Sequence, residues 1–141
     1  MQTSRENELL IMGALHGNLV EEARVIGSGD SELDAGAGQD MYIAIEQSSL
    51  LKGLVILSTS SKLLFQALTD CFATKEPLDK QKLTVFYQLH SYHLSMTIFI
   101  CTTALGEAVL QSVTAVYSNA RWYEREIQER YGITFTTDSQ D

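Results

Sequence analysis

Residues 83–101 read LTVFYQLHSYHLSMTIFIC, and this stretch decides the class of fold. Its two outer parts, 83–89 and 96–101, are rich in β-branched and aromatic residues, which favour strands. The run between them at 90–93 is polar and typical of a turn. The stretch therefore predicts an antiparallel β-hairpin.

Helical patterns lie on both sides of this hairpin. Apolar residues recur at helical spacing at 4–15, 48–57 and 120–131, with Ser118 or Asn119 as the cap of the last segment. Gly132 stands where a C-cap glycine ends a helix, and residues 133–135 leave it as an extended tail. A further short strand is expected at 42–45. The mixture predicts an α+β fold: a small mixed or antiparallel sheet with helices packed on it.

Residues 62–74, KLLFQALTDCFAT, fit two interpretations. Leu64, Ala67, Leu68 and Cys71 fall on one face of a helix, whereas the run that ends in Phe72 also fits a strand. The pattern alone leaves both open.

Length and charge limit the classes of function. The 141 residues form one domain, and the net charge is −8. Residues 1–46 hold nine acidic and two basic residues, so the acidity lies in the N-terminal helix and the Gly-rich loop of residues 1–40. Negative charge repels nucleic-acid phosphates and anionic lipids, which disfavours both as partners. Every apolar run is shorter than the roughly 20 residues that span a bilayer, so we expect no direct membrane insertion.

No residue pattern indicates a catalytic, metal or cofactor site. His90 and His93 are three residues apart, which on a strand places them on opposite faces and disfavours shared metal coordination. Ser91 lacks the G-x-S-x-G context of an activated nucleophile. A small hydrolase-type enzyme that uses Ser91, His90 or His93 stays an alternative. The two cysteines, Cys71 and Cys101, lie among apolar residues and are expected to be buried free thiols.

Residues 119–135, NARWYEREIQERYGITF, are the densest group of charged and aromatic side chains. Tyr123, Ile127 and Tyr131 form a stripe that we expect to face the core. An exposed mixture of Arg, Trp and Tyr is typical of an interface hot spot. A solvated helix with ion pairs, such as Glu126 with Arg130, explains the pattern equally well.

This stretch resembles the signature of the 30 kDa subunit of respiratory complex I, the NADH dehydrogenase C subunit, in its run from Arg121 to Ile127 and in Glu129, Gly132, Ile133 and Phe135. The same family includes component G of membrane-bound nickel–iron hydrogenases, and the aromatic Tyr123 looks like that branch. Residues 68–73 and 112–114 also resemble family segments. The resemblance covers a family-like core at 41–135, and it favours a strand for residues 64–73.

The resemblance implies a non-catalytic, cofactor-free accessory subunit or domain. It would dock on the large catalytic subunit of a hydrogenase or a complex-I-like NADH dehydrogenase, peripheral on the cytoplasmic, inner face of the membrane. The residues expected to bind that partner are Arg121, Trp122, Glu124, Arg125, Glu126, Glu129 and Tyr131. A stand-alone interaction module that has lost the complex is the alternative, and dimerisation of the isolated chain stays open.

The sequence departs from the family pattern at two places. Arg130 occupies a position that is usually apolar, and residues 136–141 replace a Gly-His-Pro-Asp-Leu-Arg segment that lies along the large subunit in the family. We therefore expect either a shortened member or an excised domain of a longer polypeptide.

Overall fold

The computed structural model describes residues 4–18, 20–27, 41–76, 78–79, 81–105 and 109–136. Nearly all of the predicted Gly-rich loop, which by its composition occupies the end of the 1–40 region from Gly27 on, and most of the tail at 136–141 lie outside the described residues.

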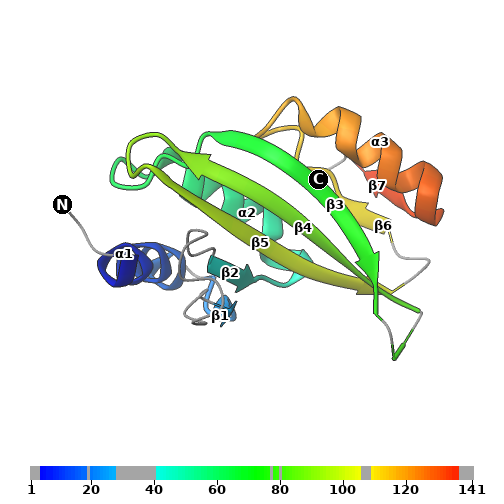
Figure 1. The fold of residues 1–141 in the computed structure, drawn as a ribbon, viewed down its shortest axis with the longest axis horizontal. Coiled ribbons are helices and arrows are strands. Elements are labelled where there is room, and N and C mark those ends of the chain that lie inside the picture. Colours follow the sequence, from blue (N-terminus) through cyan, green and yellow to red (C-terminus); the bar gives the residue numbers. More distant parts are fainter. Residues whose placement is uncertain are drawn as a thin grey trace, which may run out of the picture.

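A five-stranded mixed sheet in the order β1-β2-β5-β4-β3 forms the centre of the fold (Figure 1). A second sheet pairs β6 with β7 in parallel. The predicted α+β class is confirmed. The elements in chain order are α1 (Ser4–Gly17), β1 (Arg24–Gly27), β2 (Met41–Ala44), α2 (Gln47–Thr59), β3 (Ala67–Lys75), β4 (Lys82–Ser91), β5 (Met96–Leu105), β6 (Val109–Gln111), α3 (Ala120–Tyr131) and β7 (Thr134–Thr136).

The predicted hairpin is confirmed as β4 and β5, which pair antiparallel from Lys82 opposite Leu105 to Ser91 opposite Met96. Alternate side chains of a strand point to opposite faces of the sheet. One face of the hairpin is buried along most of its length and contributes a large part of the core. Its apolar side chains with an exposed fraction of 2 % or less are Leu83, Val85, Tyr87, Leu89, Ile98 and Ile100.

Most of the ambiguous segment is a strand, as the resemblance favoured. β3 pairs antiparallel with β4, and its register shifts between Leu68 and Asp70. Such a β-bulge adds one residue to the strand, so the inward-facing Leu68 and Cys71 are three apart instead of two. This spacing is the one that a helix would show, and it explains the helical stripe in the sequence.

The helices cover one face and one edge of the sheet. α2 lies behind the strands in Figure 1 and buries Leu50, Leu54 and Leu57. α1 packs on α2, and α3 runs beside the edge strand β3. Among the described elements, no helix lies over the face of β3, β4 and β5 that is turned toward the viewer.

Gly132 ends α3 in the left-handed conformation, with φ of 72°, and its N–H donates to the carbonyl of Gln128 at 2.9 Å. The predicted C-cap is thus confirmed. A side chain at this position would meet no heavy atom within 4 Å, so the backbone conformation alone requires glycine.

We expect Gly132→Ala to lower the free energy of unfolding by about 1 kcal/mol, because alanine is strained in this conformation. Gly13, in the middle of α1, also has no heavy atom within 4 Å of an added Cβ, and it provides a matched control. Gly13→Ala should stabilise the protein by about 0.5–1 kcal/mol, since it removes backbone freedom from the unfolded chain. Urea denaturation followed by circular dichroism measures both, and equal shifts of the two variants would contradict the strain argument.

Candidate functional site

α3 has one side that holds it to the fold and one side that faces outward. Ala120, Glu124 and Ile127 are buried on the inner side, and Tyr123 and Tyr131 pack partly against the core. This arrangement confirms the predicted stripe of Tyr123, Ile127 and Tyr131. The helix is therefore positioned by its own residues before any partner binds.

The carboxylate of Glu124 fastens α3 to the segment that follows β6. One carboxylate oxygen accepts a hydrogen bond from the hydroxyl of Ser112, and the other accepts one from the backbone N–H of Val113, both at 2.8 Å. The Ser112 oxygen also lies 2.9 Å from the hydroxyl oxygen of Thr114. Glu124 is 5 % exposed, so these bonds satisfy an acidic group inside the protein.

Burial raises the pKa of Glu124 above its ordinary value of 4.5, while the hydrogen bonds from Val113 and Ser112 oppose that rise. Because the net shift is upward, the folded protein binds the proton more tightly than the unfolded chain does.

Three side chains from the region of α3 cover the edge strand of the sheet. Asn119 Nδ2 donates to the carbonyl of Leu68 at 2.9 Å, and the Tyr131 hydroxyl donates to the carbonyl of Ala73 at 2.9 Å. The Tyr123 hydroxyl donates to the carbonyl of Thr69 at 3.3 Å. An edge strand presents backbone groups that would otherwise pair with another chain. Of the two predicted caps, Ser118 and Asn119, the structure places Asn119 at the N-cap position, but its side chain bonds to β3 and makes no capping hydrogen bond.

The outward side of α3 carries an exposed tryptophan among charged residues. Trp122 is 67 % exposed, and Arg121 and Glu126 are exposed as well. Arg125 and Glu129 form an ion pair of 3.6 Å between Nε and Oε2, and both side chains are more than 70 % exposed. Such a pair one helical turn apart contributes only about 0.3–0.5 kcal/mol.

The structure brings five of the seven residues predicted to bind a partner to this outward side. They are Arg121, Trp122, Arg125, Glu126 and Glu129. The other two point differently: Glu124 is buried on Ser112 and Val113, and the hydroxyl of Tyr131 is bonded to β3. Glu124 thus binds groups of its own domain in this structure.

Sequence reasoning missed the contact between Glu124 and residues 112–113, although a signal existed. Glu124 follows Ala120 by four residues and precedes Ile127 by three, so a helical projection places it on the buried side. An acidic residue on a buried helical face requires donors, and the segment 112–114 supplies them.

Ser91, His90 and His93 do not form the nucleophile–base arrangement of the hydrolase alternative. The Ser91 hydroxyl is fully buried, donates to the carbonyl of Leu63 and accepts from the N–H of Leu94. Nδ1 of His90 lies 2.9 Å from the Thr97 hydroxyl oxygen, and His93 lies exposed in the turn. The Ser91 hydroxyl is therefore a structural group of the hairpin.

The two thiols are free and buried, as expected. Burial raises the pKa of Cys101 to about 12 and shifts that of Cys71 in the same direction, with smaller contributions at Cys71 from Glu124 and Asp70. Thiols held in this state are poor nucleophiles. None of the helices in the described ranges has the length and apolar character needed to cross a bilayer.

Residues 43–140 match the family model described as the 30 Kd subunit of respiratory-chain NADH dehydrogenase. The C subunit of NADH-quinone oxidoreductase from Rhodospirillum rubrum is 30 % identical over 100 residues, which are 71 % of this chain and 47 % of that protein. The same protein of Rickettsia prowazekii is 34 % identical over 91 residues, covering 64 % of this chain and 46 % of the relative. For Brucella abortus the identity is 28 % over 125 residues, with coverages of 89 % and 60 %. The chain thus spans about half the length of most of these relatives.

A solved structure shares the fold. A chain of the membrane-bound sulfane sulfur reductase, an archaeal respiratory membrane complex, superposes with a TM-score of 0.73 at 16 % identity. The match covers 95 % of this chain and 72 % of that one.

We expect Glu124→Ala to lower the free energy of unfolding by about 2–3 kcal/mol. A buried donor left unpaired costs about 1–3 kcal/mol. Ser112 keeps Thr114 as a second partner, whereas the Val113 N–H has no other acceptor among the described residues. Glu126→Ala, two residues further along the same helix but exposed, is the control and should change stability by less than about 0.5 kcal/mol. Similar effects of both variants in urea unfolding would contradict the role of the Glu124 contact.

The raised pKa of Glu124 predicts a pH dependence. Its favourable contribution is fully present below the unfolded pKa, near 4.5, and is lost as the pH rises through the higher folded pKa. Glu124→Gln removes this titration. The free energy of unfolding of the wild type, relative to that of the variant, should therefore fall as the pH is raised from 4 towards 7, measured at intervals of about one pH unit. A relative stability that instead rises with pH would show that the hydrogen bonds outweigh burial.

Proposed function

The chain belongs to the family of the 30 Kd subunit of respiratory-chain NADH dehydrogenase, and from this we propose that it is a non-catalytic accessory part of a membrane-bound oxidoreductase. It docks on the large catalytic subunit of a complex-I-like NADH dehydrogenase or a nickel–iron hydrogenase. It is held peripherally at the cytoplasmic, inner face of the membrane through that complex. The names of the relatives, and of the respiratory membrane complex with the same fold, support this proposal.

The exposed Trp122 on a firmly held helix is the observation that carries the docking proposal. A tryptophan that is 67 % exposed leaves a large apolar area in water, and a partner would remove that area from solvent. Tryptophan and arginine are enriched among the residues that dominate binding energy. Because Glu124 and Ile127 hold the opposite side of α3, the helix can present Trp122 without moving.

The charges around Trp122 set orientation more than affinity. Arg125 is bonded to Glu129 at the surface, so a carboxylate of the partner can replace Glu129 at little cost. Arginine binds carboxylates through two parallel hydrogen bonds, which fixes the angle between the two groups.

We expect Trp122→Ala to weaken assembly by about 2 kcal/mol or more, roughly a thirtyfold loss of affinity, with the isolated fold unchanged. Arg125→Ala should also weaken assembly, while losing less than about 0.5 kcal/mol of folding stability. The measurement is the recovery of the large catalytic subunit with a tagged chain from gently solubilised native membranes, quantified by mass spectrometry.

Tyr92→Ala is the matched control, because Tyr92 is an exposed aromatic residue in the hairpin turn, outside α3. It should leave recovery unchanged. A wild-type chain that recovers no large subunit would overturn the docking proposal and leave the stand-alone module. Unfolding of Arg125→Ala would show that this charge serves the domain itself.

A further inference from the structure

A groove of about 160 Å³ lies between the edge strand β3 and the side of α3 that faces it. Ala73 and Phe72 line it from the strand, and Ile127 and Tyr131 line it from the helix. A cavity of about 150 Å³ with apolar walls accommodates a benzene ring in a protein interior. The groove is therefore large enough for one aromatic or branched aliphatic side chain.

Two opposite charges stand at this groove. Glu126 and Arg130 line it from α3, one turn apart, and both are exposed. In the described part of the chain neither of these two side chains has an ion-pair partner, whereas Arg125 and Glu129 form an ion pair with each other. Arg130 also stands where the family resemblance leads one to expect an apolar residue. The groove thus combines apolar side chains, such as that of Ile127, with two charged side chains that have no ion pair among the described residues.

An aromatic cluster lies on the helix-free face of the sheet, and Phe72 is one of its members. Tyr42 stacks on Phe99 with ring centres 4.6 Å apart, and Phe72 stacks on Phe86 at 5.0 Å. Edge contacts join the two pairs, so the four rings form one group across β2, β5, β4 and β3. Phe99 is only 7 % exposed although it points away from the core, because the other rings cover it.

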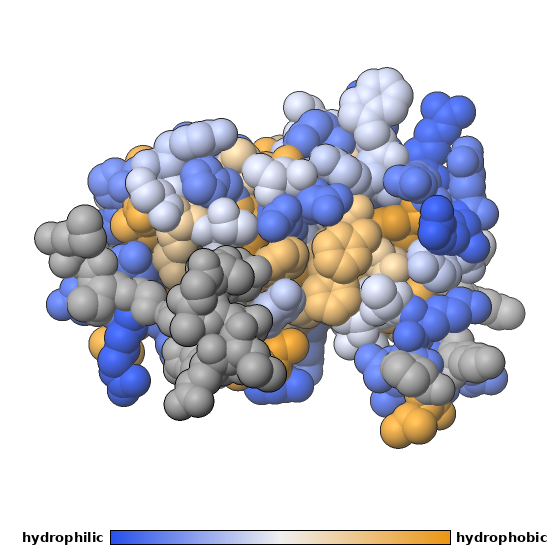
Figure 2. Space-filling model, viewed as in Figure 1, coloured by the Kyte–Doolittle hydropathy of each residue, from blue (hydrophilic) through white to orange (hydrophobic). Residues whose placement is uncertain are grey.

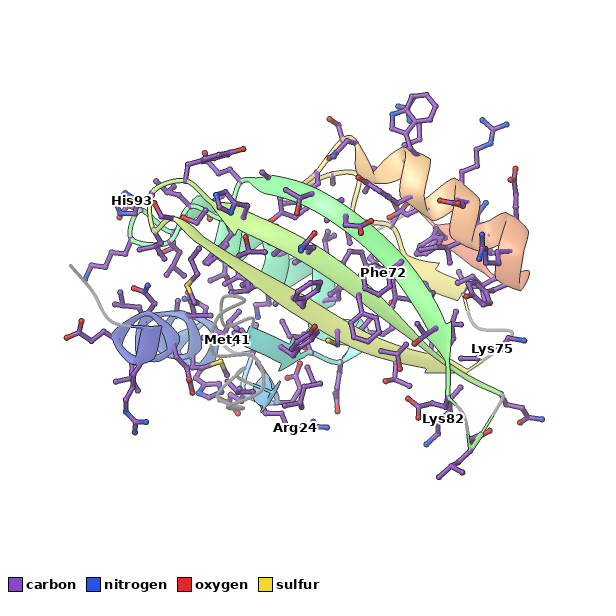
Figure 3. The ribbon with its side chains drawn as sticks, viewed as in Figure 1. Arg24, Met41, Phe72, Lys75, Lys82 and His93 are labelled. Carbon is purple, nitrogen blue, oxygen red and sulfur yellow. The ribbon has the colours of Figure 1, made fainter. Side chains whose placement is uncertain are left out.

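Phe72 belongs to both features. It lies in the middle of β3, on the face of the sheet turned toward the viewer in Figure 3, and it is 37 % exposed. Figure 2 shows apolar side chains gathered at the centre of this same face, beside the polar surface of α3. Phe72 therefore links the two features, since it lines the groove and its ring belongs to the cluster.

We propose that the docking surface on α3 continues across this groove to Phe72, and that the groove receives an apolar side chain of the same large subunit. The partner segment carries an aromatic or branched aliphatic residue flanked by an acidic group for Arg130 and a basic group for Glu126. This inference rests on the proposed function and specifies the part of the partner that binds.

The net charge favours this occupant over a second copy of the chain at long range only. Each copy has a net charge of −8, which opposes the approach of two copies, although most of that charge lies in residues 1–46 and not at the groove. The groove also shares α3 with the proposed docking residues, since Glu126 lies one turn from Trp122 along the helix. A partner seated on Trp122 is thus brought directly to the groove.

Site-specific photo-crosslinking tests this geometry in the assembled complex. The photoreactive aromatic residue p-benzoylphenylalanine is placed at position 72, at position 122 and, as a control, at position 92. Illumination of the complex in solubilised native membranes should join positions 72 and 122 to the same large subunit, and position 92 to none.

The outcomes separate the two proposals. A crosslink from position 122 without one from position 72 would overturn the groove inference and leave the docking on α3 intact. No crosslink from either position would overturn both. A crosslink from position 72 to a second copy of the chain would assign the face to a homodimer and so contradict the inference.

Side-chain truncation provides an independent readout. Phe72→Ala and Arg130→Ala should each lower the recovery of the large subunit about tenfold, whereas Tyr92→Ala should not. Since Phe72 stacks on Phe86, the folding of Phe72→Ala is checked by circular dichroism, and Arg130→Ala tests the groove without touching that contact. Unchanged recovery with Arg130→Ala and folded Phe72→Ala would overturn the inference.

Discussion

The buried carboxylate of Glu124 joins the last helix to the segment that follows β6, and the outward face of α3 depends on this contact. The carboxylate accepts hydrogen bonds from one hydroxyl and one backbone N–H. These two bonds limit both the sliding of the helix along its axis and its rotation about that axis. The two stretches that carry the family resemblance most specifically, 112–114 and 121–135, are therefore in contact with one another. A motif residue that looks suited to a partner acts first on its own chain, and its neighbours Trp122 and Arg125 are presented as a consequence.

The edge of the sheet imposes a second constraint on the same helix. No strand in the described part of the chain pairs with β3 on its outer side, so some of its backbone carbonyls need donors from elsewhere. Asn119, Tyr123 and Tyr131 supply them. The aromatic residues of the 119–135 stretch thus serve two purposes: the tyrosines protect an edge strand, and the tryptophan remains in solvent.

Local patterns predicted the elements that follow simple periodicities. The hairpin, Gly132 and the stripe of α3 came from residue spacing alone, because alternation and helical recurrence act over a few residues. β3 did not, since its bulge places Leu68 and Cys71 at a helical distance within a strand. At the candidate site, the sequence predicted the helix and most of its outward residues, but it did not predict the contacts that hold the helix to the fold. The donors to Glu124 lie at 112–113, and the strand beside Tyr131 lies at 67–75, so both contacts are fixed by tertiary folding that local spacing does not encode.

β6 and β7 pair in parallel, and α3 is the segment that crosses between them. Parallel strands cannot be joined by a tight turn, so both ends of the helix are tied to one small sheet. In such a unit of two paired strands and one helix, α3 cannot turn about one end alone. We expect β6, α3 and β7 to unfold locally together. Little conformational entropy is then lost when the exposed face meets another surface. The association is accordingly close to the meeting of two rigid bodies, with its rate set by orientation and charge instead of by a folding step.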